Sequence, residues 1–379
     1  MKEFFPLSFF NNICICTKFF TFCIVFACIH YRGNAQVEPS FWQTLSVTAR
    51  MNWGSFLASK AKSEYIKDSY SVLGEIDISS ANLGKKNWQQ QSGFPETGIG
   101  LLYGSSGSKA YMGDIAAAIA FINFHLIKRG IFKTNIRVGF GPGWVEKPFN
   151  TESNYKNLLI GTHLNACINF LLSSEFQLAK HLNLDAGISF THLSNGSVKV
   201  PNLGLNIPAF SLGITYTLNP QFQPQKKTLP SFPKKINYYL FTFVAAKEAY
   251  PLESAVYLVN VVNFEILKDI SYTGRFGGGI NFTDDRASSE EIPNSPTYEF
   301  NKSKSQLQAS VYAAYEYVIG NLSIPLQLGV YLYNNYPIQA MYQNIGIRYH
   351  FSAHWIAAVE LKAHLGAGDF IQWGLGYKF

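Results

Sequence analysis

The chain has 379 residues and a formal net charge of +7, and its aromatic content of 16% slightly exceeds its charged content of 15%. This length allows one to three domains, and so few charged residues argue against a soluble, helix-rich enzyme. The lysines are scattered over turns and one proline-rich stretch rather than gathered on a helix. We therefore expect the positive charge to aid solubility and attraction to anionic lipid headgroups, and we expect no nucleic-acid partner.

The first 36 residues have the pattern of an export signal. Lys18 precedes an apolar run from Phe19 to Ile29, and small residues that suit cleavage follow before Gln36. The run is too short to cross a bilayer as a helix. We predict that residues 1–36 form a signal peptide that is cleaved on export.

Cysteine usage agrees with this interpretation. All cysteines except Cys167 lie within the predicted signal peptide and would be removed with it. A single remaining cysteine cannot form an internal disulfide, and we expect no metal site or cofactor. A lipoprotein anchored through Cys28 is an alternative, although the residues before Cys28 fit that pattern poorly.

Beyond the signal, apolar and polar residues alternate with a period of two, which is typical of strands with one apolar and one polar face. We count about eight candidate strands between Phe41 and Leu218 and about eight more between Ile236 and Phe379. The alternation is clearest in the C-terminal segment, where apolar residues on one face oppose glycine and polar residues on the other: Ile371, Trp373, Leu375, Tyr377 and Phe379 against Gln372, Gly374, Gly376 and Lys378.

The pattern predicts an all-β protein with an antiparallel transmembrane β-barrel. Aromatic residues such as Trp144 and Trp355 lie near strand ends, as a membrane-interface belt requires, and the terminal Phe379 resembles the signal that outer-membrane assembly machinery reads. We divide the chain into a strand half at 37–218, a proline- and lysine-rich turn or linker at 219–235, and a second strand half at 236–379. We expect one barrel of about sixteen strands, with two tandem eight-stranded barrels as the alternative.

One predicted hairpin carries residue types that suit chemistry. His192 and Ser194 are two residues apart on a strand, so their side chains share a face. That face also carries Ile188 and Phe190 and is therefore the apolar, lipid-facing one. On the next strand, Asn206 has the parity that places it on the same face. A base beside a hydroxyl, with a third group that orients the base, is the arrangement that acyl hydrolases use.

The run from Phe190 to Asn206, F-T-H-L-S-N-G-S-V-K-V-P-N-L-G-L-N, resembles the lipid A 3-O-deacylase family of outer-membrane barrels. The resemblance implies that His192 is the general base and Ser194 the nucleophile. It also implies that Asn195 and Asn202 support the oxyanion or the loop. From the residues themselves, the backbone amides around Asn195 and Gly196 and the amide of Asn202 are the candidate donors to the oxyanion. Where the family carries a glutamate to orient the histidine, this chain has Asn206. Asparagine can hold a tautomer but supplies no charge.

The function expected from these features is an outer-membrane serine esterase that removes an ester-linked 3-hydroxyacyl chain from lipid A. Its partners would be lipid A or lipopolysaccharide of the outer leaflet and the outer-membrane assembly machinery. The alternatives are a non-catalytic barrel, either a porin or a scaffold, and a phospholipase that uses the same nucleophile.

Overall fold

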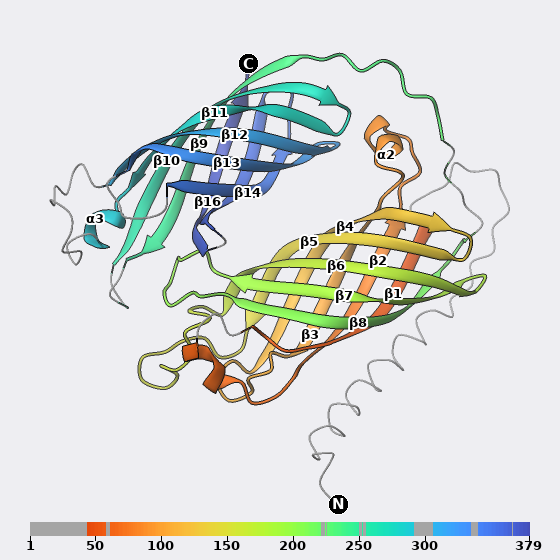
Figure 1. Cartoon of the computed structure of the whole chain (residues 1–379), viewed down its shortest axis with the longest axis horizontal. Helices are drawn as coiled ribbons and strands as arrows, with labels where there is room; N and C mark the ends of the chain where they lie inside the picture. Colours follow the sequence, from red (N-terminus) through yellow and green to blue (C-terminus); the bar gives the residue numbers. More distant parts are fainter. Residues whose placement is uncertain are drawn as a thin grey trace, which may run out of the picture.

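The computed structural model describes residues 44–57, 61–220, 224, 226–249, 252, 255–291, 306–334, 340–365 and 367–379. Within these residues, sixteen antiparallel strands form two closed barrels of eight strands each (Figure 1). The predicted signal peptide at residues 1–36 lies outside the described residues.

The first barrel is built from the N-terminal half of the chain, and each strand pairs with its neighbour in sequence. Its strands are β1 (Leu45–Gly54), β2 (Ser71–Ala81), β3 (Glu96–Ser105), β4 (Asp114–Arg129), β5 (Phe132–Val145), β6 (Leu164–Ala179), β7 (Leu182–Ser194) and β8 (Leu205–Thr217). The connections carry a 3₁₀ helix, η2 (Ala61–Ile66), and a short helix, α2 (Asn87–Gln91).

The second barrel follows the same up-and-down order. Its strands are β9 (Ile236–Glu248), β10 (Val256–Ser271), β11 (Gly274–Asp285), β12 (Leu307–Ile319), β13 (Leu322–Asn334), β14 (Met341–His350), β15 (Trp355–His364) and β16 (Ala367–Lys378), and α3 (Ser288–Glu291) follows β11. None of the helices in the described part of the chain has both the length and the hydropathy needed to span a membrane.

The pairing of the last strand in each half decides between the two architectures. β8 returns to β1, with Ser211 opposite Asn52, rather than continuing to β9. β9 pairs instead with β10 and with β16, so that Tyr239 lies between Glu265 and Lys378. The predicted single barrel of about sixteen strands is therefore wrong, and the two halves close separately as tandem barrels.

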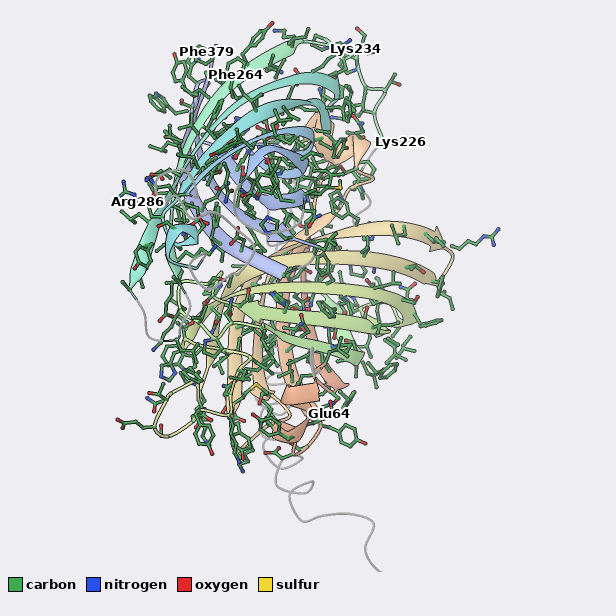
Figure 2. The ribbon with its side chains drawn as sticks, turned by 60° about the vertical axis from the view of Figure 1, so that its left-hand side comes forward. Glu64, Lys226, Lys234, Phe264, Arg286 and Phe379 are labelled. Atoms are coloured by element: carbon green, nitrogen blue, oxygen red, sulfur yellow. The ribbon has the colours of Figure 1, made fainter. Side chains whose placement is uncertain are left out.

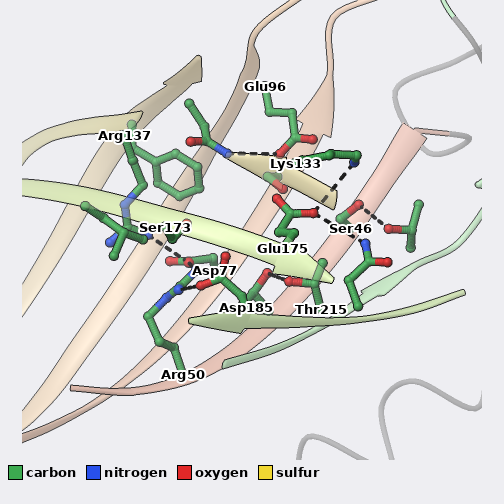
Figure 3. A pocket seen from close by; sticks show the side chains of 17 residues that line it. Ser46, Arg50, Asp77, Glu96, Lys133, Arg137, Ser173, Glu175, Asp185 and Thr215 are labelled. Atoms are coloured by element: carbon green, nitrogen blue, oxygen red, sulfur yellow. Dashed lines mark hydrogen bonds and ion pairs between the residues drawn. The ribbon is translucent and has the colours of Figure 1, made fainter. Parts of the chain in front are cut away.

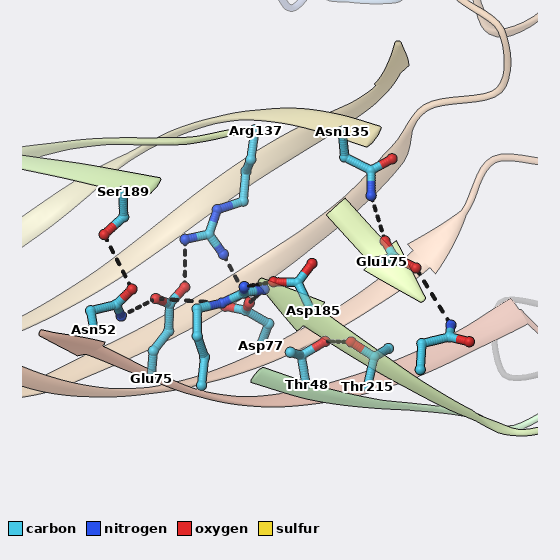
Figure 4. Close-up of polar contacts among 12 residues, drawn as sticks. Thr48, Asn52, Glu75, Asp77, Asn135, Arg137, Glu175, Asp185, Ser189 and Thr215 are labelled. Carbon is cyan, nitrogen blue, oxygen red and sulfur yellow. Dashed lines mark hydrogen bonds and ion pairs between the residues drawn. The ribbon is translucent and has the colours of Figure 1, made fainter. Parts of the chain in front are cut away.

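Side chains in the barrel interiors give the physical reason for this closure. In the first barrel, Arg137 from β5 donates to Asp77 of β2, three strands away, over 2.8 Å (Figure 4). In the second, the Arg348 guanidinium is buried and contacts several carboxylates. An eight-stranded barrel is just wide enough for side chains to fill. A sixteen-stranded barrel would surround a channel too wide for such pairs to cross.

The outer surfaces of both barrels are apolar. In β7, Ile188 is 64% exposed whereas its neighbour Ser189 is 3% exposed. In the second barrel, Phe264 of β10 and the terminal Phe379 also lie on the outside (Figure 2). The predicted alternation is therefore observed with polar residues inside and apolar residues outside, which is the arrangement of a barrel that faces lipid.

Candidate active site on the outer wall of the first barrel

The end of β7 and the start of β8 bring three of the predicted site residues together. His192 lies directly opposite Asn206 in the pairing of the two strands. The His192 Nδ1 atom is 2.7 Å from Asn206 Oδ1, and His192 Nε2 is 3.0 Å from the Ser194 hydroxyl. When Nδ1 carries the ring hydrogen, it donates to the asparagine, and Nε2 is then free to accept the serine proton. The three side chains form one continuous hydrogen-bonded chain.

The alternation of the strands directs this chain outward. Thr191, Leu193 and Ile207 are buried inside the barrel, whereas the three linked side chains are half-buried on the outer wall. The backbone of Asn206 is held from the other side as well, because its carbonyl accepts the N–H of Leu57 just beyond β1. The geometry thus agrees with the parity argument from the sequence.

A glycine that sequence reasoning did not single out gives the histidine its space. Gly204 precedes β8 with φ of +80°, a conformation that favours glycine. A methyl group at this position would lie 2.8 Å from Cε1 of His192 and would push the ring. A glycine two residues before the orienting asparagine, at the foot of the hairpin loop, is the signal that could have identified it.

The loop from Asn195 to Gly204 holds the candidate oxyanion donors. The Asn195 backbone N–H donates to the Asn202 side-chain oxygen over 3.1 Å. The Asn195 side-chain amide donates to Thr162 Oγ1 and to the Lys199 carbonyl. Both amide groups of Asn195 are thus used to brace the loop. In the described part of the chain, the Gly196 N–H and the Asn202 side-chain amide donate to no acceptor, and these two remain as candidate donors.

The wall beside the serine is apolar and contains a small residue. Ala166 of β6 lies opposite Ser194, and Ile168 lies opposite His192. Further along the same face, Ile188, Phe210 and Phe170 are exposed. An acyl chain would therefore find an apolar surface that begins next to the hydroxyl.

A polar pocket lies elsewhere, inside the first barrel near the start of β1 and the end of β8 (Figure 3). Its lining includes Arg50, which forms ion pairs with Asp77 and with Asp185. It also includes Glu175, which contacts Asn135 and Lys133. These side chains fill the barrel and do not face His192. Over the described residues, His, Cys, Asp and Glu form no group that could hold a metal ion.

Two family models match the chain, one in each barrel. The lipid A 3-O-deacylase (PagL) model matches residues 78–215, and the acyloxyacyl hydrolase C-terminal domain model matches residues 236–379. The first match includes β7 and the start of β8, which carry the hydrogen-bonded chain. The second begins at the first residue of β9 and runs to the C-terminus.

Solved structures resemble parts of the chain at low identity. Neisserial surface protein A is 11% identical with a TM-score of 0.33, covering 46% of this chain and 97% of its own. The outer-membrane enzyme PagL is 19% identical with a TM-score of 0.30, covering 45% and 98%. A Rhodopseudomonas blastica porin mutant is 8% identical with a TM-score of 0.17, covering 88% and 99%. No curated protein matches the chain in sequence. The family matches nevertheless assign both barrels: the chain combines a domain of the lipid A 3-O-deacylase (PagL) family with an acyloxyacyl hydrolase C-terminal domain.

Proposed function

We propose that this protein is an outer-membrane serine esterase that removes an ester-linked 3-hydroxyacyl chain from lipid A. The observation that carries the proposal is the hydrogen-bonded chain from Asn206 through His192 to Ser194 on the apolar outer wall. Serine is a poor nucleophile unless a neighbouring base accepts its proton. The domain match to lipid A 3-O-deacylases supplies the substrate class.

The proposed reaction proceeds in two steps. His192 Nε2 takes the hydroxyl proton while Ser194 Oγ attacks the ester carbonyl, and the Gly196 N–H and the Asn202 amide stabilise the oxyanion. The tetrahedral intermediate breaks its bond to the sugar oxygen, which receives the proton from His192 and leaves as the sugar hydroxyl. Water, deprotonated by the same imidazole, then attacks the acyl-serine. The second tetrahedral intermediate breaks its bond to Ser194 Oγ, which takes the proton back from His192, and the free 3-hydroxy fatty acid leaves. No metal or cofactor is needed for these steps.

The location follows from the same surface. Because both barrels have apolar outer faces and filled interiors, we propose that both sit in the outer membrane after export and cleavage of a signal peptide. The aromatic end, Tyr377 to Phe379, would be read by the outer-membrane assembly machinery. In this setting the ester of an outer-leaflet lipid could reach Ser194 directly from the membrane.

A non-catalytic porin is the alternative of another class. A pore needs an open lumen, whereas ion pairs such as Arg137 with Asp77 and Arg348 with Glu265 cross the interiors of the two barrels. Conductance in planar bilayers would test that alternative directly. A phospholipase would share Ser194 and differ only in the lipid that is cut.

The deciding experiment compares the lipid A of cells that express wild type, Ser194→Ala or His192→Ala. We expect mass spectrometry to show loss of one 3-hydroxyacyl chain with wild type and intact lipid A with both variants. Ser174→Ala is a matched control. Ser174 has the outward parity of the exposed Leu172 on β6, but it lies opposite Ala186 and away from the site. Identical lipid A in all strains would reject the deacylase. Fatty acid released from glycerophospholipid vesicles in a Ser194-dependent way, with lipid A unchanged, would indicate the phospholipase.

A further inference from the structure

The last residue of β9 has an unusual environment. In this strand Phe241, Phe243 and Ala245 are buried inside the second barrel, while Val244 is 54% exposed on the outside. Glu248 has the same parity as Val244 and so belongs to the outer wall. It is nevertheless only 4% exposed. Something outside the second barrel must cover this carboxylate.

The cover is the loop between β7 and β8 of the first barrel. The Val200 N–H donates to Glu248 Oε2 over 2.6 Å, and the Glu248 backbone N–H donates to the Ser197 carbonyl over 3.0 Å. Alongside, Gly196 packs so closely on β16 that an added methyl group would lie 2.4 Å from the Ile371 side chain. The loop that carries the candidate oxyanion donors is thus fastened to the second barrel at three successive places.

From these contacts we propose that Glu248 is a positioning residue for the esterase site, through which the second barrel fixes the oxyanion loop of the first. This proposal rests on the proposed function. The Gly196 N–H lies immediately before Ser197, which the Glu248 backbone holds, and Asn202 lies two residues after Val200, which the Glu248 side chain holds. The two candidate donors therefore flank the fastened segment.

The physical argument is one of preorganisation. Oxyanion donors lower the barrier only when they already point to the position that the charge will occupy, since a loop that must reorder during the reaction loses much of the benefit. A hydrogen bond from an amide to a carboxylate is stronger than one to a neutral acceptor. The contact at Val200 is also buried, so that removing the carboxylate leaves an amide without a partner.

The test uses the full-length protein and purified lipid A in mixed micelles. Glu248→Ala removes the acceptor, whereas Glu248→Gln keeps an oxygen in the same place. Asp269→Ala is the matched control, because it removes a carboxylate at the other end of β10 that contacts Arg275 of the same barrel. We expect kcat to fall about 10- to 100-fold in Glu248→Ala, with KM unchanged, and to recover to within a few-fold of wild type in Glu248→Gln. Asp269→Ala should keep the wild-type kcat.

Either of two kinetic results would overturn the proposal: a wild-type kcat in Glu248→Ala, or an equal loss of kcat in Glu248→Ala and Glu248→Gln. Hydrogen exchange at the Val200 amide separates this proposal from the proposed function. If neither wild type nor any variant cleaves lipid A, the esterase is rejected, and faster exchange in Glu248→Ala then supports only the fastening of the loop by Glu248. Unchanged exchange at Val200 would reject the positioning role whatever the activity.

Discussion

Replacing Asn206 with aspartate should increase the rate of the proposed reaction. Aspartate has the same length as asparagine, so its carboxylate oxygen can occupy the place of Oδ1, now 2.7 Å from His192 Nδ1. The neutral imidazole of the resting site gains little from this charge. The imidazolium that forms when Ser194 attacks is stabilised by it, and the benefit therefore appears in the transition state.

The magnitude follows from the geometry. Opposite unit charges centred about 4 Å apart attract by about 4 kcal/mol at an effective dielectric constant near 20. Because the site is half-buried on the outer wall, screening by water and headgroups reduces this to about 1 to 2 kcal/mol. Since about 1.4 kcal/mol corresponds to a factor of ten in rate, we expect kcat to rise about tenfold and KM to stay constant.

The assay is steady-state release of 3-hydroxy fatty acid from lipid A in mixed micelles, measured over a range of lipid A concentrations. Asn206→Leu is the companion variant, because it fills a similar volume without an acceptor for Nδ1. We expect its kcat to fall about 100-fold, as the ring is no longer held in the productive tautomer. Wild-type kcat in both variants would refute the role of Asn206, and a slower Asn206→Asp enzyme would refute the charge argument.

Three further outcomes follow from the structure. Gly204→Ala should reduce kcat at least tenfold, since the new methyl group displaces the His192 ring; unchanged kinetics would contradict this close approach. Arg137→Met leaves Glu75 in the barrel interior with one cation fewer and should lower the free energy of unfolding by about 3 to 5 kcal/mol. On semi-native gels the folded barrel should then be lost at a lower temperature, and an unchanged transition would contradict this. Partial burial favours the neutral form of Asp68, but the backbone N–H groups of Ala110 and its neighbour outweigh this and hold the pKa of Asp68 below its usual value. A lowered folded pKa means that the loop contact is present above about pH 4 and is lost as pH falls through the folded value. At pH 6 the Ala110 amide should exchange faster in Asp68→Asn than in wild type, and at low pH the two exchange rates should become equal. Equal rates already at pH 6 would contradict the role of the Asp68 carboxylate.

Much of each barrel could be predicted from local sequence. Alternation with period two identifies the strands and separates their inner and outer faces, because it reflects only the direction of successive side chains. The same parity brings His192, Ser194 and Asn206 to one face. The loop geometry is not encoded in this way, and so the sequence could not show that both amide groups of Asn195 are used internally.

The closure of the barrels could not be predicted from alternation, because a strand with a good inner and outer face can pair with any suitable partner. The information lay instead in the charges on the inner faces. Arg137 on β5 and Asp77 on β2 are three strands apart in the sheet and can meet only across a narrow barrel. Buried cations that find carboxylate partners within their own half of the chain are thus a better guide to the number of barrels than the total count of strands.

The second barrel needs a reason to accompany the first, since the proposed reaction uses residues of the first barrel alone. A small closed barrel filled by its own side chains is a rigid body, and a rigid body beside a loop can hold that loop still. The loop after Ser194 packs on Ile371 and makes hydrogen bonds with both the backbone and the side chain of Glu248. In the proposed reaction, fixing this loop would lower the cost of organising its donors for the transition state, and a site whose base is oriented by a neutral asparagine would gain most from that.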